Sequence, residues 1–123
     1  MSTVMIVDDS ATLRQMLATF LTKSGFNVIE ASDGVEAKEK IQVKCPDLVV
    51  LDILMPRMNG YDLCRWLRSD PKARHIPVVM CSSKAEEFDR YWGMKQGADA
   101  YIAKPFHPAE MLNTVKLFLS KGR

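Results

Sequence analysis

Five short apolar runs, each followed by a longer segment with helical periodicity, constrain the fold of this chain more than any other feature. The runs are VMIV (4–7), NVIEA (27–31), LVVL (48–51), VVMC (78–81) and AYIA (100–103). Short continuous apolar runs are typical of strands in a parallel sheet that is covered on both faces. Because strand and helix alternate five times along the chain, we expect an α/β protein built on a five-stranded parallel sheet.

The polarity of the runs predicts the order of the strands within the sheet. Strands one, three and four are purely apolar, as central strands usually are, whereas strands two and five are mixed, as edge strands can be. This difference favours the spatial order 2-1-3-4-5 over 3-2-1-4-5, because the second order would place the run 48–51 at an edge. Right-handed crossovers then give a doubly wound, flavodoxin-like, three-layer α/β/α sandwich with two helices on one face and three on the other.

Each segment that follows a strand carries one apolar stripe, which marks the buried face of a helix. Along the chain the stripes are Leu13, Met16, Leu17, Phe20 and Leu21; Gly34, Ala37 and Ile41; Gly60, Leu63, Cys64 and Leu67; Phe88, Tyr91 and Trp92; and Met111, Leu112, Val115, Phe118 and Leu119. In the fourth stripe we expect Phe88 and Trp92 to belong to the core rather than to a binding surface.

Length and composition exclude several classes of protein. With 123 residues, 47% of them hydrophobic and 26% charged, we expect a single globular domain over 1–123 without an output domain. No apolar run is long enough to span a bilayer and no secretory signal opens the chain, so we expect a cytoplasmic protein with no membrane contact. A net charge of +2, without a run of like charges, gives no indication of nucleic-acid binding.

Cysteines and histidines are not spaced as metal ligands. Cys45, Cys64 and Cys81 lie far apart and form no C-x-x-C pair, and His75 and His107 have no ligand-spaced neighbours. We therefore expect reduced thiols, ordinary histidines and no zinc.

Polar side chains follow four of the apolar runs, at the points where the strands end. Asp8 and Asp9 follow the first strand, Asp52 the third, Ser82 the fourth and Lys104 the fifth. Because parallel strands end at the same edge of a sheet, these side chains should meet in one crevice, where the strand order switches. Two carboxylates about 4 Å apart repel by roughly 4 kcal/mol at an effective dielectric of 20. A cation is therefore expected to hold the three acids together.

Magnesium is the cation that fits this set of groups. Mg²⁺ prefers oxygen ligands and keeps several water positions, one of which a phosphate oxygen can take. Three carboxylates, one Mg²⁺ and one lysine are electrically balanced, Lys104 can hold a second phosphate oxygen, and Ser82 can donate a hydrogen bond to a third. Asp52 is then free to attack phosphorus and to form an aspartyl phosphate.

Each of these residues also has an ordinary structural explanation. A residue of DDS (8–10) can cap the first helix, and Asp52 can start a turn before MPRMNG. Ser82 can cap the fourth helix, and Lys104 can be a solvated surface lysine. We favour the functional interpretation because all five candidates fall just past the ends of four strands.

At these residues the chain resembles the receiver domain of two-component response regulators, the single-domain chemotaxis type in particular. The resemblance runs through VMIVDDS, LVVLDILMPRMNG, IPVVMCSS and GADAYIAKPF, which together span essentially the whole chain. It implies that a histidine kinase phosphorylates Asp52, and that Asp8 and Asp9 bind Mg²⁺ with Asp9 the more direct ligand. It also implies a metal contact from the Leu54 carbonyl and a cis Lys104-Pro105 peptide bond.

The resemblance assigns a switch as well. It implies a phosphate contact from Lys104, a switch hydroxyl at Ser82, and an aromatic ring at Tyr101 that turns inward when this hydroxyl moves toward the phosphoryl group. The surface formed by the fourth helix, the fifth strand and the fifth helix would then change its affinity for a downstream protein. A plain edge-strand tyrosine is the alternative for Tyr101. The candidates for the rim of this partner surface, with solvated helix face as their alternative, are Arg90, Met94, Lys95 and His107.

Three positions bear on how long a phosphoryl group would persist. Serine stands at position 82, where threonine is common in the family; it keeps the hydroxyl but lacks the methyl group that limits rotation. Leu54 and Lys84 occupy positions whose side chains tune the access of the hydrolytic water in the family. We expect the apolar Leu54 to shield the aspartyl phosphate.

Together these features predict a stand-alone receiver that acts by binding and catalyses only its own phosphorylation and dephosphorylation. The stretch YWGMKQGADAYIAKP looks like single-domain regulators of pilus-based motility, while a flagellar switch partner and a phosphate-sink role stay open. One alternative is a docking module that never becomes phosphorylated. Another is a phosphatase of the haloacid dehalogenase type, which would need a second aspartate where Leu54 stands.

Overall fold

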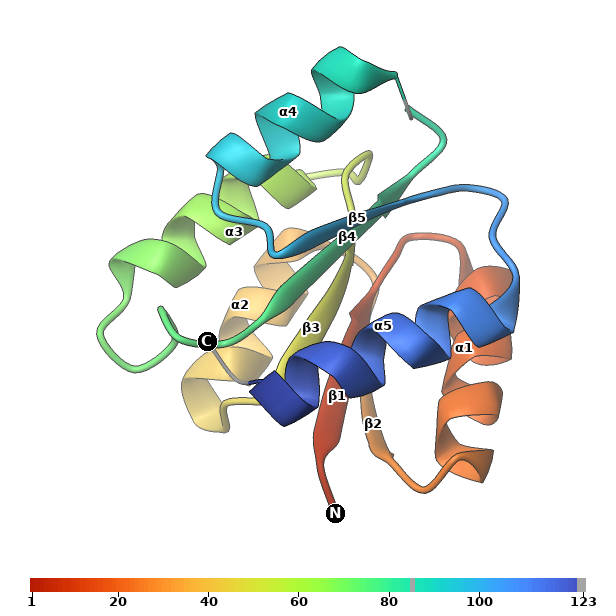
Figure 1. Ribbon diagram of the computed structural model, residues 1–123. Helices are drawn as coiled ribbons and strands as arrows, with labels where there is room; N and C mark the ends of the chain where they lie inside the picture. The colour runs from red at the N-terminus through yellow and green to blue at the C-terminus, as the bar shows by residue number, and fades with distance from the viewer. Residues whose placement is uncertain (85, 122–123) are drawn as a thin grey trace.

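The protein is a three-layer α/β/α sandwich (Figure 1) in the computed structural model, which describes residues 1–84 and 86–121. The sheet forms the middle layer. Helices α1 (Ala11–Lys23) and α5 (Pro108–Lys121) cover one face. Helices α2 (Gly34–Val43), α3 (Gly60–Ser69) and α4 (Glu87–Lys95) cover the other. The predicted division of two helices against three is confirmed.

Five parallel strands make the sheet, in the predicted order β2-β1-β3-β4-β5. Their bounds are β1 (Thr3–Val7), β2 (Asn27–Ala31), β3 (Leu48–Asp52), β4 (Val78–Ser82) and β5 (Ala100–Ala103). Strands β3 and β4 are buried along their whole length, whereas β2 and β5 at the edges keep partly exposed residues.

Alternation along the central strands builds a core on both faces of the sheet. In β1, Met5 and Val7 join the core on the side of α2 and α3, whereas Val4 and Ile6 join the core on the side of α1 and α5. The residues of β3 and β4 divide in the same way. Each fully buried side chain of this size contributes about 1.5–3 kcal/mol to stability. Between its terminal residues a central strand is therefore apolar, because successive side chains enter opposite cores.

Side-chain caps set where the first three helices begin. Ser10 Oγ accepts a hydrogen bond from the Leu13 backbone N–H at 3.2 Å, and Asp33 and Asn59 cap α2 and α3 in the same way. A cap of this kind contributes about 1 kcal/mol. Since Ser10 caps α1, the two aspartates before it are left for another role.

The exposure of α4 contradicts the prediction from its apolar stripe. Phe88 and Trp92 were expected in the core, yet they are 71% and 42% exposed, and Tyr91 is 58% exposed. The one buried residue of α4 is Gly93. The spacing of the aromatic residues correctly indicated a helix, but it did not indicate which side of that helix faces the sheet.

The start of α4 is a second correction. The N-cap residue is Glu86, which forms a capping box with Asp89, and not Ser82. Ser82 lies too early in the chain because four residues separate the end of β4 from the first helical residue, Glu87.

The Lys104-Pro105 peptide bond is cis, as the resemblance implied.

Candidate functional site at the carboxyl edge of the sheet

The sheet brings the predicted residues to one edge. Asp8 and Asp9 directly follow β1, Asp52 ends β3, Ser82 ends β4, and Lys104 directly follows β5. These four strands are consecutive neighbours in the sheet, and Ser82 pairs in register with the residue before Lys104. The expectation that these residues meet at one edge of the sheet is therefore confirmed, while their functional roles stay predictions.

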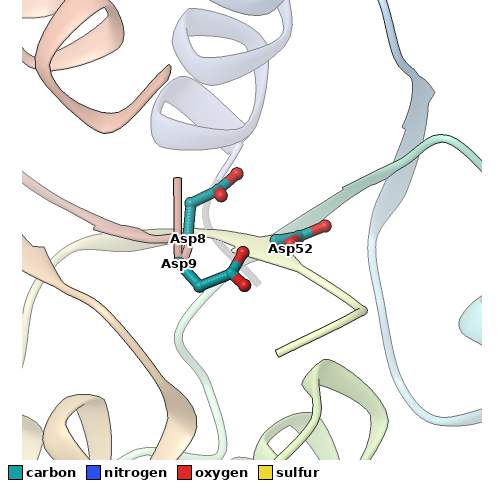
Figure 2. Close-up of side chains that lie close together, drawn as sticks. All are labelled: Asp8, Asp9 and Asp52. Carbon is teal, nitrogen blue, oxygen red and sulfur yellow. The ribbon is translucent and has the colours of Figure 1, made fainter. Parts of the chain in front are cut away.

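Three carboxylates form the centre of this edge (Figure 2). One carboxylate oxygen from each of Asp8, Asp9 and Asp52 lies within 4.8 Å of the others. Asp8 and Asp52 are buried, with 2% and 6% exposure, while Asp9 is open to solvent. Two buried carboxylates and one solvent-exposed carboxylate suit Mg²⁺, because this ion binds hard oxygen ligands and keeps some of its water molecules. The donor set therefore fits the metal implied by the sequence.

Lys104 balances part of the negative charge. Its Nζ atom lies 2.9 Å from Asp8 Oδ2 and 3.3 Å from Asp52 Oδ1. Burial opposes the charged form of this lysine, but the hydrogen bond from its ammonium group to Asp8 and the nearby Asp52 carboxylate together raise its pKa. Lys104 is therefore a partly buried, charged member of the site, with 20% of its side chain exposed, rather than a solvated surface lysine.

The pKa of Asp52 is raised above its ordinary value. Burial is the largest cause, the negative charge of Asp8 adds to it, and the ammonium group of Lys104 works in the opposite direction. An ionised Asp52 is thus held against a desolvation penalty, which a divalent cation at the cluster would relieve.

Backbone contacts hold Asp8 in place. Its Oδ1 accepts a hydrogen bond from the Ser10 N–H at 2.9 Å, and its carbonyl oxygen accepts one from Arg14 Nη1 at 2.7 Å. Since Oδ2 binds Lys104, both oxygens of Asp8 have fixed partners. Sequence reasoning missed Arg14; its position one turn into α1 was the only local signal for this contact.

Ser82, Lys84 and Tyr101 form one network beside the acids. The Ser82 hydroxyl is completely buried and accepts a hydrogen bond from the Lys84 N–H at 3.1 Å. The Tyr101 hydroxyl donates to the Lys84 carbonyl. Burial raises the pKa of Tyr101, and a hydrogen bond with Ser82 acts in the opposite direction. The ring of Tyr101, only 8% exposed, is thus turned inward toward the end of β4.

Leu54 lies in the loop that leaves β3. Its side chain is 49% exposed two residues after Asp52, and the loop is closed by a hydrogen bond from the Gly60 N–H to the Ile53 carbonyl at 2.9 Å. The expected metal contact from the Leu54 carbonyl stays a prediction.

An apolar groove of about 430 Å³ borders the site. It is lined by Leu13, Met16, Ser83, Lys104, Pro105 and Phe106. A groove of similar size, about 450 Å³, lies between the ends of α2 and α3 at the opposite edge of the sheet. Volume alone therefore does not identify the functional edge; the cluster of charged groups does.

The fold and the site together define a class: doubly wound α/β domains with an acidic, lysine-bearing ligand site where the strand order switches. Within that class, the chain belongs to the response regulator receiver domain family, whose sequence model matches residues 4–116. Receiver domains of this family bind Mg²⁺ at an acidic pocket of this kind and accept phosphate from histidine kinases.

Similar curated proteins are transcriptional regulators. The chain is 40% identical over 119 residues to the alkaline phosphatase synthesis transcriptional regulatory protein PhoP of Bacillus subtilis, covering 97% of this chain and 49% of that protein. It is 34% identical over 120 residues to the transcriptional regulatory protein GltR of Pseudomonas aeruginosa, covering 98% of this chain and 50% of that protein. The chain thus spans about half the length of these relatives.

Similar solved structures are receiver domains of nearly equal length. A response regulator from Chloroflexus aurantiacus superposes with a TM-score of 0.93 at 35% identity, covering 97% of this chain and 98% of that one. The chemotaxis response regulator CheY4 of Vibrio cholerae superposes with a TM-score of 0.90 at 32% identity, covering 95% and 98%. The flavodoxin-like receiver fold expected from the sequence is confirmed.

Proposed function

We infer that this chain is a phosphorylation-controlled switch in which Asp52 accepts a phosphoryl group from a histidine kinase. The observation that supports this most directly is the position of Lys104, whose ammonium group lies within 3.3 Å of both Asp8 and Asp52. A cation shared by a nucleophilic carboxylate and a neighbouring acid can move onto a phosphate oxygen without leaving the site.

Asp8, Asp9 and Asp52 are the side chains that would hold Mg²⁺, together with the carbonyl oxygen of Leu54. When bound, the metal neutralises charge on the phosphoryl oxygens during transfer. The fit rests on the three carboxylate oxygens within 4.8 Å of one another.

The transfer proposed for Asp52 is a simple displacement. One carboxylate oxygen of Asp52 attacks phosphorus, an O–P bond forms, the P–N bond of the donor phosphohistidine breaks, and the departing imidazole takes up a proton. Lys104 holds one phosphoryl oxygen as a point charge, and Ser82 donates its hydroxyl hydrogen to another. In this role the protein catalyses only its own phosphorylation and hydrolysis and is not an enzyme acting on other molecules.

The groove next to Lys104 is our candidate contact for the phosphodonor. Its lining by Leu13, Met16, Pro105 and Phe106 is apolar, and Met16 is 42% exposed. A donor protein must bring its phosphohistidine within bonding distance of Asp52, and this apolar groove borders the acids through Lys104.

Tyr101 would transmit the effect of phosphorylation to the partner surface. Arg90 Nη1 donates to the Tyr101 carbonyl at 3.0 Å, and its guanidinium lies 5.5 Å from the centre of the tyrosine ring. A movement of Ser82 toward the phosphoryl group would therefore be transmitted through Tyr101 to Arg90 and to the face formed by α4, β5 and α5. Met94, Lys95 and His107 are the further rim candidates for a protein partner on this face.

The pathway is a separate proposal. A chemotaxis or pilus-motility role has support from the likeness to CheY4, whereas the curated relatives are transcriptional regulators, some of them named DNA-binding. The expectation of no nucleic-acid contact stays a prediction for residues 1–123, and so do the stand-alone arrangement and the cytoplasmic location. Among the described residues, none forms a helix with the length and hydropathy needed to cross a membrane.

The experiment that tests the central proposal is incubation with acetyl phosphate and Mg²⁺, followed by intact mass. Wild type should gain one phosphoryl group and Asp52→Asn none. A matched control is Asp62→Asn, which removes an exposed carboxylate of α3 and should leave the gain intact. Beryllofluoride with Mg²⁺ should change tryptophan fluorescence in wild type only, through Trp92 of α4.

The same experiment separates the alternatives. If wild type gains no mass and beryllofluoride has no effect, the domain is a docking module that works without phosphorylation. If it turns over an external phosphate ester and this activity is lost in Asp52→Asn, it is a phosphatase.

A further inference from the structure

We propose that the ion pair between Asp33 and Arg57 is a positioning device that holds the β3–α3 loop in the conformation that binds Mg²⁺. This inference rests on the proposed function, because it concerns how the same metal site is formed. Neither Asp33 nor Arg57 is among the residues that would hold the metal or the phosphoryl group.

The pair joins two loops that lie far apart in the sequence. Arg57 Nε and Nη2 donate to the two carboxylate oxygens of Asp33 at 2.8 and 3.0 Å. The Asp33 side chain is 9% exposed and that of Arg57 57% exposed. Such two-pronged contacts define the orientation of both groups, which a single contact does not.

Asp33 is itself fixed from the other side. Its Oδ1 accepts the Glu36 N–H at 2.8 Å as the cap of α2. This backbone hydrogen bond and the Arg57 guanidinium lower the pKa of Asp33, although burial works against them. The acceptor is therefore an ionised group anchored to the start of a helix.

Arg57 adopts a backbone conformation that arginine rarely takes. Its φ angle is +67°, in the left-handed region, and no other non-glycine residue among those described has a positive φ. A side chain in this region is disfavoured unless its surroundings hold it there. Two interactions hold it: the Met58 N–H donates to the Pro56 carbonyl at 2.8 Å, which closes a tight turn around Arg57, and the Asp33 carboxylate binds the arginine side chain.

The two loops also touch through their backbones. A Cβ atom at Gly34 would lie 2.5 Å from the Met58 carbonyl oxygen and 2.7 Å from Met58 Cβ. Only glycine at position 34 therefore permits this close approach to Met58. The ion pair lies next to it, because Asp33 precedes Gly34 and Arg57 precedes Met58. Residues 53–59 are thus held at the β3 end by the sheet, at Gly60 by its hydrogen bond to Ile53, and in the middle by Arg57.

The ion pair affects the metal site because the loop that it holds contains Leu54. Leu54, whose carbonyl is the expected fourth metal contact, lies between Asp52 and the clamped residue Arg57. If the Asp33–Arg57 ion pair is broken, the two ends of the loop stay fixed but its central residues become more mobile. The Leu54 carbonyl oxygen is then no longer held facing the acids. Outer-sphere contacts that orient a ligand typically change metal affinity by 10-fold to 100-fold.

A positioning role and a purely electrostatic role of Arg57 predict opposite changes in Mg²⁺ affinity when this residue is replaced. Removing a cation near an acidic site strengthens the binding of a divalent cation if charge alone acts. Removing a positioning group weakens it. In Arg57→Gly the ion pair is lost while glycine adopts the φ of +67° without steric strain. Asp33→Asn weakens the same pair without changing the backbone at residue 57, so it controls for the added chain freedom of glycine.

The experiment measures Mg²⁺ affinity by titration calorimetry without a phosphodonor, together with urea unfolding in EDTA. We expect Arg57→Gly and Asp33→Asn each to bind Mg²⁺ roughly tenfold more weakly than wild type, and the double variant to be no weaker than either single variant. The unfolding midpoint of Arg57→Gly should stay near that of wild type. Arg65→Gln, which breaks the exposed pair with Asp62 on α3, is the control for loss of one arginine and should bind Mg²⁺ as wild type does.

Unchanged or stronger Mg²⁺ binding in Arg57→Gly would overturn the proposal while leaving the phosphoacceptor function standing. Additive losses in the double variant would overturn it as well, since they would show two independent effects. Failure of wild type to bind Mg²⁺ would instead remove the proposed function, and this inference with it.

Discussion

Gly93 of α4 lies so close to the ring of Tyr101 on β5 that a Cβ atom added to it would stand 2.9 Å from Tyr101 Cδ2. The same Cβ would lie 3.1 Å from Met80 Sδ on β4. The inward position of Tyr101, with its hydroxyl on the Lys84 carbonyl, therefore requires that α4 present no side chain at residue 93.

Gly93→Ala should push the Tyr101 ring away from β4. The new methyl group overlaps the ring, which costs about 1–3 kcal/mol in a packed site, while alanine returns about 1 kcal/mol of helix propensity. Because the two effects oppose each other, we expect a modest change in stability and a clear loss of proton NOEs between the Tyr101 ring and the Met80 methyl group.

A second background checks this cause. In Tyr101→Ala the ring no longer overlaps a methyl group at residue 93, and the flexible Met80 side chain, 3.1 Å from that position, can shift into the vacated space. Adding Gly93→Ala should then stabilise the protein by about 1 kcal/mol. Retention of the NOEs in Gly93→Ala, or a loss of stability in the Tyr101→Ala background, would contradict the packing argument.

Asp52→Asn should stabilise the metal-free protein at neutral pH. The folded state raises the pKa of Asp52 above the value of 3.8 through burial and the charge of Asp8, so the folded protein binds this proton more tightly than the unfolded chain does. The penalty for ionised Asp52 is complete above the folded pKa and disappears as the pH falls toward 3.8. Urea unfolding in EDTA should show a gain of about 1 kcal/mol at neutral pH that shrinks in acid.

Mg²⁺ should reverse the order of stability of wild type and Asp52→Asn. Mg²⁺ that binds only the folded state stabilises it in proportion to the logarithm of its concentration, and wild type has one more carboxylate to hold it. Wild type should therefore become the more stable of the two at saturating Mg²⁺. An advantage for Asp52→Asn that is unchanged from acid to neutral pH would show that ionisation of Asp52 is not its source.

Arg68→Met should be strongly destabilising. The Arg68 guanidinium donates to three backbone carbonyls, those of Arg74, Ile76 and Gly97, and to Asp99, and its side chain is 16% exposed. Removing it takes the arginine donor from four acceptors, three of them partly buried, and each such hydrogen bond contributes about 0.5–1.5 kcal/mol, more where a charged group takes part. We expect a loss of about 3 kcal/mol in urea unfolding, against no more than about 0.5 kcal/mol for Arg65→Met, whose side chain is half exposed.

Leu54→Asn should shorten the lifetime of the phosphorylated protein. Leu54 is 49% exposed beside Asp52, and an amide in its place can orient an attacking water by hydrogen bonding. We expect decay of the phosphoryl mass to accelerate roughly tenfold after removal of the donor, the effect of one hydrogen bond of about 1.4 kcal/mol gained in the transition state. Leu117→Asn on α5, an equally exposed leucine at 47%, should decay as wild type does. Equal lifetimes for Leu54→Asn and wild type would end the shielding hypothesis.

Much of the carboxyl edge followed from local patterns. The apolar run of β1 ends at Asp8 and that of β3 at Asp52, and parallel strands bring their ends together whatever the loops do. The prediction failed at α4, where Phe88 and Trp92 repeat at helical spacing yet lie on the open side. A stripe with only three apolar members is too short to indicate which side of a helix is buried when a glycine makes the actual contact.

The sequence by itself determined the five strands, their order and the polar residues at their ends, because burial on two faces leaves a continuous apolar run in the interior of a central strand. Only the tertiary structure decided that Lys104 lies between Asp8 and Asp52, that Tyr101 turns inward over Gly93, and that Arg57 reaches Asp33. Each of these contacts joins residues that are at least eight positions apart along the chain and belong to different helices, strands or loops. Their distances depend on how those elements pack, and no local pattern of polarity records that.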